Sequence, residues 1–210
     1  FRFAEHQWDI CGNDNEKIAS DYDGWIDLFG YGTSGYMGCQ PYEHSKDEKQ
    51  YPAQDIANTD YDWGKYNPIS NGGNKEGLWR TLTKDEWSYL INDRPNALKL
   101  RAKACVNGVE GLVILPDDFF EKRIRVPYDA TPDNYSDNSY SSEQWKTMED
   151  AGVVFLPRAG YRNSQTYMGG GFIWTSDEEC SSRAFELNMA EITISYSNKL
   201  YGEAVRLVSE

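Results

Sequence analysis

The sequence lacks several features that would assign the chain to a functional class at once. No apolar run approaches the roughly 20 residues that a membrane-spanning helix requires. Only two histidines occur, His6 and His44, and neither lies near a serine or cysteine motif that would make it a catalytic base. We therefore expect no membrane span in this chain and no nucleophile–histidine active site.

Cysteine is also scarce and scattered. The chain has four cysteines, Cys11, Cys39, Cys105 and Cys180. They show no CxxC spacing and no clustering with histidine, so we expect no zinc site. Four cysteines permit three pairings, and spacing alone does not choose among them or exclude free thiols.

Basic residues are outnumbered, and they form no stripe. Asp and Glu total 34 against 21 Lys and Arg, which gives a net charge of -13. A surface this acidic repels phosphate backbones and anionic lipid, so we expect no nucleic-acid partner. We interpret the charge as a source of solubility rather than as a specific acidic site.

Although only 39% of the residues are hydrophobic, 15 Tyr, 7 Trp and 8 Phe supply enough large apolar side chains for a core. The length of 210 residues predicts a single domain over residues 1–210, with a long loop-rich N-terminal region over about 1–77. The chain begins at Phe1 rather than at methionine, so we expect a signal or lipid anchor to lie outside it.

Two helices have clear start signals. Thr83 and Glu86 form the pattern of a capping box, in which each side chain bonds the other residue's backbone, and Pro95 ends this helix. A second helix is expected to start at Ser141 or Ser142 and to stop at Gly152. We expect its Trp145, like Trp174 further along the chain, to lie in the core.

Short strands make up most of the remaining regular structure. Residues 101–106 and 112–115 are expected to form a hairpin around Asn107–Gly108, a dipeptide that tolerates the positive φ angles of tight turns. Further antiparallel strands are expected at 153–156, 172–175, 183–188, 191–196 and 203–208. The predicted fold class is α+β, with two helices packed on small antiparallel sheets and long irregular loops.

Several segments carry a family resemblance. They are Trp25–Gly35, Tyr66–Gly73, Leu78–Trp87, Val106–Asp117, Val154–Pro157, Ala159–Arg162 and Val205–Val208. In this order they resemble the Fibrobacter succinogenes major paralogous domain, which is frequent in secreted and surface proteins of Bacteroidetes-type bacteria. The resemblance implies a C-type-lectin-like fold and a cell-surface or secreted location, as in an outer-membrane-anchored lipoprotein. It supplies no catalytic residue, because the molecular function of the family is largely undefined.

The chain departs from the sugar-binding C-type lectins at their calcium ligands. Gln40–Pro41–Tyr42 lacks the third ligand of the usual triplet, and Ile91–Asn92–Asp93 lacks the tryptophan of the second motif. The acidic cluster at Asp14, Asn15, Asp21 and Asp23 does not match an EF-hand either, and we interpret it as turns on a solvated face. We therefore expect no cofactor; calcium is left open without a motif to support it.

The C-terminal loops are the expected recognition surface, since loops on a rigid scaffold commonly carry function. The candidate ligand-binding residues combine amides with flat rings: Asn163, Gln165, Tyr167, Asn188, Tyr196 and Asn198. Such a set suits a glycan or a host or bacterial surface protein. No catalytic or metal-binding residue is predicted.

The leading hypothesis is a non-enzymatic recognition or adhesion module. The first alternative is an enzyme, either a relative of the formylglycine-generating enzymes, which use a cysteine pair, or a glycan-active hydrolase. The second alternative is a structural domain of a surface assembly. A cysteine beside Cys180, or strongly shifted carboxyls in a deep pocket, would favour the enzyme.

Overall fold

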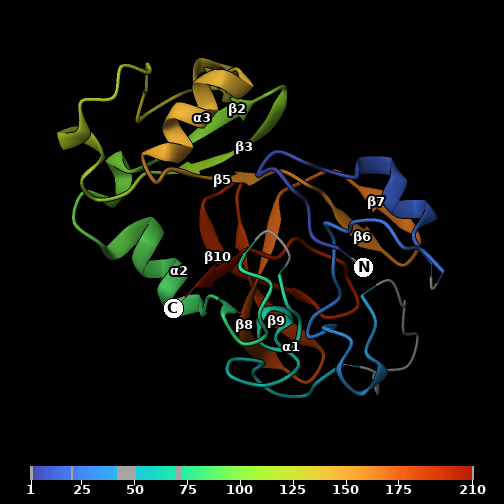
Figure 1. Cartoon of the computed structure of the whole chain (residues 1–210). Helices are drawn as coiled ribbons and strands as arrows, with labels where there is room; N and C mark the ends of the chain where they lie inside the picture. The colour runs from blue at the N-terminus through green and yellow to red at the C-terminus, as the bar shows by residue number, and fades with distance from the viewer. Residues whose placement is uncertain (1, 20, 42–50, 70–71, 210) are drawn as a thin grey trace. The chain divides into compact units, whose positions relative to one another are not determined.

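The computed structural model describes residues 2–19, 21–41, 51–69 and 72–209 (Figure 1). It is 21% helix and 30% strand, which confirms a mixed α+β class with small sheets. The chain divides into two compact units: unit 1 contains Phe1–Glu5, Ile10–Trp87 and Ala159–Glu210, and unit 2 contains His6–Asp9 and Ser88–Arg158. The single domain over residues 1–210 stays a prediction, because two compact units can belong to one domain.

Unit 2 is built on a four-stranded sheet in the order β4-β2-β3-β5. Its strands are β2 (Arg101–Val106), β3 (Val109–Ile114), β4 (Ser139–Tyr140) and β5 (Val154–Pro157). The predicted turn between β2 and β3 is confirmed, with φ of 49° at Asn107 and 84° at Gly108. Only β4 pairs in parallel, beside β2, because it returns to the sheet through a long loop.

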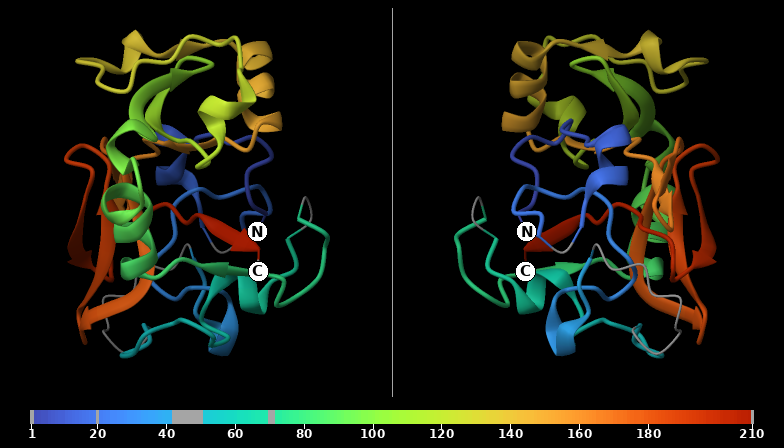
Figure 2. Two further views of the ribbon diagram at one scale, coloured as in Figure 1. Left: turned by 90° about the vertical axis from the view of Figure 1, so that its left-hand side faces the viewer. Right: turned by 90° about the vertical axis from the view of Figure 1, so that its right-hand side faces the viewer.

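The helix α3 (Ser142–Asp150) covers the core of unit 2, and Figure 2 shows it beside β2 and β3. Ser141 and Gln144 form its capping box, which confirms the expected start. Trp145 and Met148 point inward and are fully buried. They pack with Phe155 and Val106 in one apolar cluster, so this helix is held by its buried face.

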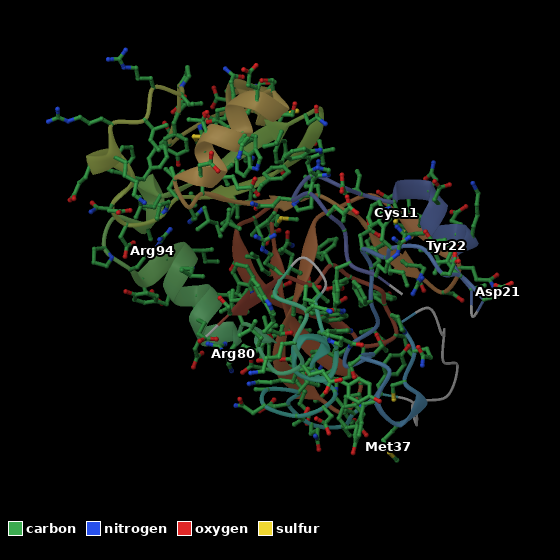
Figure 3. All side chains as sticks on the ribbon, in the orientation of Figure 1. Cys11, Asp21, Tyr22, Met37, Arg80 and Arg94 are labelled. Atoms are coloured by element: carbon green, nitrogen blue, oxygen red, sulfur yellow. The ribbon has the colours of Figure 1, made fainter. Side chains whose placement is uncertain are left out.

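The other helical turns of unit 2 are short. They are η4 (Tyr89–Asp93, a π-helical turn), η5 (Ala97–Lys99), η6 (Phe119–Lys122) and η7 (Tyr135–Asp137). Arg94, labelled in Figure 3, ends η4 directly before Pro95, as the proline predicted. Its buried guanidinium pairs with Asp117 at 3.0 Å and donates to the backbone carbonyl of Leu90.

Unit 1 contains the remaining elements. Its helical elements are η1 (Gly12–Lys17), η2 (Tyr36–Gly38), α1 (Trp63–Tyr66) and α2 (Lys84–Ser88), whose last residue belongs to unit 2. Its strands are β1 (Trp79–Thr81), β6 (Tyr161–Asn163), β7 (Thr166–Met168), β8 (Phe172–Cys180), β9 (Arg183–Asn188), β10 (Thr193–Asn198) and β11 (Leu207–Ser209). The capping box of α2 is confirmed: the Glu86 amide donates to Thr83 Oγ1, and the Thr83 amide donates to Glu86 Oε2.

Strands β8, β9 and β10 form the main sheet of unit 1, visible as adjoining orange and red arrows in Figure 2. Tyr196 pairs with Phe185, and Ser195 pairs with Glu186, so the two pairs lie on opposite faces. The face with Glu186 also carries Trp174, whose side chain belongs to the apolar core of unit 1. We call this the inner face, and the face with Tyr196 the outer face. Strand β10 begins two residues later than the predicted 191–196.

The segment predicted as a strand at 203–208 is regular only at its end. Leu207–Ser209 forms β11, which pairs antiparallel with β1. Before it, Gly202 and Ala204 make single bridges to Arg162 and Ile173, and Glu203 bridges to Phe29. The prediction was wrong for 203–206, because Glu203 and Ala204 each bridge to a different segment and residues 205 and 206 lie in no strand.

Aromatic side chains fill the core of unit 1, as the composition predicted. Trp63 and Trp174 are fully buried, and Phe29 stacks against Phe3 at 5.5 Å while meeting Trp63 edge-on at 5.9 Å. In contrast, Met37 is 76% exposed and projects outward in Figure 3. Trp145 and Trp174 therefore both occupy cores, as expected.

Candidate functional site

The outer face of the β9–β10 hairpin presents an exposed aromatic ring beside a cation. Tyr196 is 52% exposed, and the Arg183 guanidinium lies 4.6 Å from its ring centre. Next to this pair, Lys84 lies 4.5 Å from the ring of Phe185, which is the cross-strand neighbour of Tyr196. We call Lys84, Arg183, Phe185 and Tyr196 the Tyr196 face. Cation–π contacts hold both rings in defined positions, so this face is preformed rather than loose.

Asn188 and Asn198 lie at opposite ends of the same hairpin. Asn188 pairs with Thr193 and Asn198 with Arg183, which places them about 17 Å apart along the strands. Each side-chain oxygen caps a turn: Asn188 Oδ1 accepts from the Ala190 amide at 3.0 Å, and Asn198 Oδ1 accepts from the Leu200 amide at 2.9 Å. The side chains of Asn188 and Asn198 therefore have a structural role in addition to any contact with a ligand.

Replacing Asn188 with alanine is expected to lower the free energy of unfolding by about 1 kcal/mol, because its side chain also reaches the Glu191 amide at 3.5 Å. Urea unfolding measures the change. Asn163→Ala, on an exposed residue, is the matched control and should change stability by less than about 0.5 kcal/mol. Equal stability of the two variants would mean that the cap contributes nothing and would leave ligand contact as the only role for Asn188.

The remaining three predicted residues lie on a second hairpin, formed by β6 and β7. Asn163 and Gln165 are exposed at its tip, where Ser164 adopts a φ of 57°. Tyr167 is half-buried, and its ring lies so close to Gly160 that a β-carbon at that glycine would sit 2.3 Å from it. Tyr167 is thus partly a packing residue, whereas Asn163 and Gln165 are available at the surface.

The six predicted residues therefore form two groups on separate hairpins of unit 1. β6 pairs with β7, and β10 pairs with β9, in different sheets. Within the β9–β10 group, only Tyr196 is freely exposed. The cation partners Lys84 and Arg183 were not predicted, although Arg183 stands directly across the strand pair from Asn198.

Two buried carboxyls of unit 1 were not predicted from the sequence. Glu186 and Glu203 are 4% and 1% exposed, and burial together with the neighbouring Glu186 raises the pKa of Glu203 well above its usual range. A faint signal existed: Glu203 stands in the apolar run 202–208, and Glu186 alternates with Phe185 and Leu187. Neither pattern says that these carboxyls are buried.

Burial raises the pKa of Glu203, as in many catalytic acids, but neither Glu203 nor Glu186 is accessible to a substrate. A catalytic group must contact its substrate, and glycosidase carboxyls face each other across a sugar at about 5–9 Å. Glu186 and Glu203 are instead both enclosed in the protein interior. The arrangement therefore gives no support to a glycan-active hydrolase.

Cysteine chemistry gives little support to the other enzyme alternative. All four cysteines lie in the described part of the chain, and no disulfide joins any two of them. Cys180 has the hydroxyl of Ser182 at 3.6 Å, and a hydrogen bond with Arg183 lowers the pKa of its thiol. A formylglycine-type site would need a second thiol beside it, and none of the other three cysteines pairs with it.

The acidic N-terminal cluster is occupied by its own hydrogen bonds. Asn15 donates to the carbonyl of Gly12 and to Asp27 Oδ1, and Asp14 pairs with Lys17 at 2.7 Å. Within the described ranges, no three His, Cys, Asp or Glu side chains gather in a way that could hold a metal ion.

Neither histidine is placed in a catalytic arrangement by the described residues. His6 stacks on Trp8 at 4.8 Å, and its Nδ1 lies 3.1 Å from Asp9 Oδ2, which is a local surface arrangement. His44 lies outside the described residues. Of the helices that the structure describes, none is both long and apolar enough to cross a bilayer.

No family model, curated protein or solved structure matches this chain.

Proposed function

We propose that this chain is a non-enzymatic recognition module of a cell-surface or secreted protein, with a C-type-lectin-like fold. It binds a glycan or a surface protein through its C-terminal hairpins. The observation that carries the proposal is the Tyr196 face, where an exposed ring is held beside Arg183 on a regular strand pair. Tyrosine and arginine are the residue types that most often supply binding energy at recognition surfaces.

Three features support the fold and the binding mode. The two longer helices, α2 and α3, occur in the expected order among small antiparallel sheets. Strand β11 pairs with β1, so the C-terminal segment that displays the hairpins is tied to the resembling segment Leu78–Trp87. The flat ring of Tyr196 suits the C–H face of a sugar, and Arg183 suits a polar or acidic group beside it. A lipid anchor outside this chain, as in an outer-membrane lipoprotein, completes the proposal and rests on the family resemblance.

The direct test is a glycan and surface-protein array probed with the purified chain, once with calcium and once with chelator. A saturable signal that survives chelation supports the proposal. A signal lost in chelator would show that the acidic groups bind calcium after all. No signal on either array would contradict it and would favour a structural domain, whose mark is a stable oligomer in solution.

Replacing Tyr196 with alanine is expected to raise the Kd of the ligand at least about 10-fold, because truncating a central interface tyrosine costs about 1.4 kcal/mol or more of binding free energy. The melting temperature should change little, since half of the ring is already exposed. Tyr89→Ala is the matched control: Tyr89 is 51% exposed but belongs to unit 2. Equal binding by both variants would place the ligand elsewhere.

A further inference from the structure

Strand β10 is an edge of the main sheet of unit 1. The strand order is β10-β9-β8, and among the described residues no strand other than β9 pairs with β10. Tyr196 is 52% exposed, and none of the residues Thr193–Asn198 is buried. An edge strand exposes a row of backbone N–H and C=O groups along one side. The hydrogen-bond pattern identifies the residues of β10 that direct these groups away from the sheet.

The register of the β9–β10 hairpin fixes this pattern. Tyr196 lies opposite Phe185, and the Lys199 amide continues the same alignment by donating to the Ser182 carbonyl at 3.0 Å. In an antiparallel pair, hydrogen-bonded residues alternate with residues that do not bond each other. Counting back in twos from Lys199, the odd-numbered residues of β10 bond β9. Ile194 and Tyr196 therefore direct both their N–H and their C=O away from β9.

The other side of β9 shows the same alternation. The Met189 amide donates to the Gly171 carbonyl at 3.0 Å, so the odd-numbered residues of β9 bond β8 and the even-numbered ones bond β10. No backbone or side-chain group in the described part of the chain bonds the amide or the carbonyl of Ile194 or Tyr196. The carbonyl of Asn198, the next outward residue, already accepts a backbone bond at 2.9 Å in the turn that follows.

Strand β10 also lacks the features that usually keep an edge strand from pairing. Natural edges carry lysine, proline, a bulge or an inward-pointing charge. Thr193–Asn198 contains no charged residue and no proline, and it pairs with β9 without a register shift. Its threonine, isoleucine and tyrosine favour extended backbone. The edge therefore has free donors and acceptors and no feature that prevents another strand from pairing with them.

A second copy of this chain is complementary to the edge. When two β10 strands run antiparallel with Ile194 opposite the partner's Tyr196, every outward residue meets an outward residue, and each such pair exchanges both N–H···O bonds. Opposite residues share a face, so each Tyr196 ring lies beside an isoleucine, which is a favourable cross-strand pair. A shift by two residues would instead use Ile192, whose φ is 52°, or the engaged carbonyl of Asn198.

Charge acts on this contact only from a distance. The paired strands themselves are uncharged, whereas each whole chain carries a net charge of -13. Repulsion between two acidic copies is screened by salt. Association through β10 should therefore strengthen as salt is added, whereas a contact held by ion pairs would weaken.

We propose that this chain forms a two-fold symmetric dimer in which β10 pairs with β10 of a second copy and joins the two sheets into one. This inference goes beyond the proposed binding function and does not depend on it. Because the outer face continues across the paired strands, the dimer carries both Tyr196 faces on one side of the sheet. A ligand with repeated units that contacts both faces is held more tightly than by one face alone.

Sedimentation velocity of the purified chain over a concentration series, with no ligand present, tests the proposal. The wild type should pass from monomer to dimer as its concentration rises, and more readily at high sodium chloride. Ile194→Pro removes an amide that β9 does not use, and edge strands tolerate proline at such positions. Because each copy loses one donor, the Kd of the dimer should rise about 10-fold or more. Ile194→Val keeps the amide and a β-branched side chain and is the matched control, with a Kd near that of the wild type.

A wild type that stays monomeric at every concentration and salt would overturn the proposal, and so would a dimer that Ile194→Pro leaves unchanged. These measurements are made without the arrays, so a dimer that binds nothing and a monomer that binds are told apart.

If Ile194→Pro does not fold, amide hydrogen exchange of the wild type gives the answer at residue level. The amides of Ile194 and Tyr196 should exchange fast in dilute protein and slowly in concentrated protein. Those of Ser195 and Ser197, which bond β9, should exchange slowly in both. Fast exchange of Ile194 and Tyr196 at both concentrations would refute the dimer. Protection that appears only when a protein from the array is added would also refute it and would place a foreign strand on this edge.

Discussion

Replacing Trp174 with alanine is expected to lower the free energy of unfolding by about 3–5 kcal/mol, the typical cost of truncating a buried tryptophan. The side chain is fully buried, its Nε1 donates to the Phe29 carbonyl at 2.8 Å, and its ring meets Tyr31 edge-on at 5.6 Å. The variant therefore loses packing on all sides and one hydrogen bond to the Phe29 carbonyl, which keeps the Glu203 amide as a donor at 2.9 Å. Denaturant unfolding followed by circular dichroism measures the loss.

Two further variants make this result interpretable. Trp174→Phe keeps a ring but removes the indole N–H, so it should lose less stability than alanine. Met37→Ala removes a large apolar side chain that is 76% exposed and should cost less than about 0.5 kcal/mol. If Trp174→Ala were as mild as Met37→Ala, Trp174 would not lie in a well-packed core, and the assignment of the inner face would fail.

Local signals were sufficient to predict the helix starts and the tight turn. Thr83 with Glu86, and Ser141 with Gln144, use side chains within one helical turn, and Asn107–Gly108 requires only its own positive φ angles. Such features depend on few neighbours, so a single sequence contains nearly all the information. The prediction of a strand at 203–208 was wrong before Leu207, because the residues that bridge to Glu203 and Ala204, Phe29 and Ile173, lie far away in the chain.

The alternation in β9 shows where pattern reasoning stops. A period of two correctly puts Phe185 and Glu186 on opposite faces, but it does not state which face is covered. The usual choice would bury Phe185 and expose Glu186. The structure buries Glu186, and Ser195 on β10 supplies a hydrogen bond to its carboxyl there. The Tyr196 face has the same origin, since Lys84 reaches Phe185 across about a hundred residues of sequence.

Asp62 is a further buried acid, and its replacement by alanine should cost about 3–5 kcal/mol. Its carboxylate accepts from the Gly64 amide at 3.0 Å, the Thr81 amide at 2.9 Å and Thr81 Oγ1 at 3.1 Å. It thereby caps α1 and joins it to β1. Because Asp62 is fully buried, alanine would leave these donors unpaired, at about 1–3 kcal/mol each.

Urea unfolding of Asp62→Ala, Asp62→Asn and Asp14→Ala distinguishes the loss of the capping hydrogen bonds of Asp62 from the loss of an acidic charge at any position. Asparagine keeps one accepting oxygen but turns an N–H₂ group toward a donor, so it should lose less stability than alanine while remaining well below the wild type. Asp14 is largely exposed and pairs only with Lys17, so its removal should cost less than about 1 kcal/mol. A small loss at Asp62 would mean that water replaces the carboxylate, and that β1 and β11 are held by their own pairing rather than through α1. A large loss would instead make Asp62 the link through which α1 stabilises the strand pair of β1 and β11.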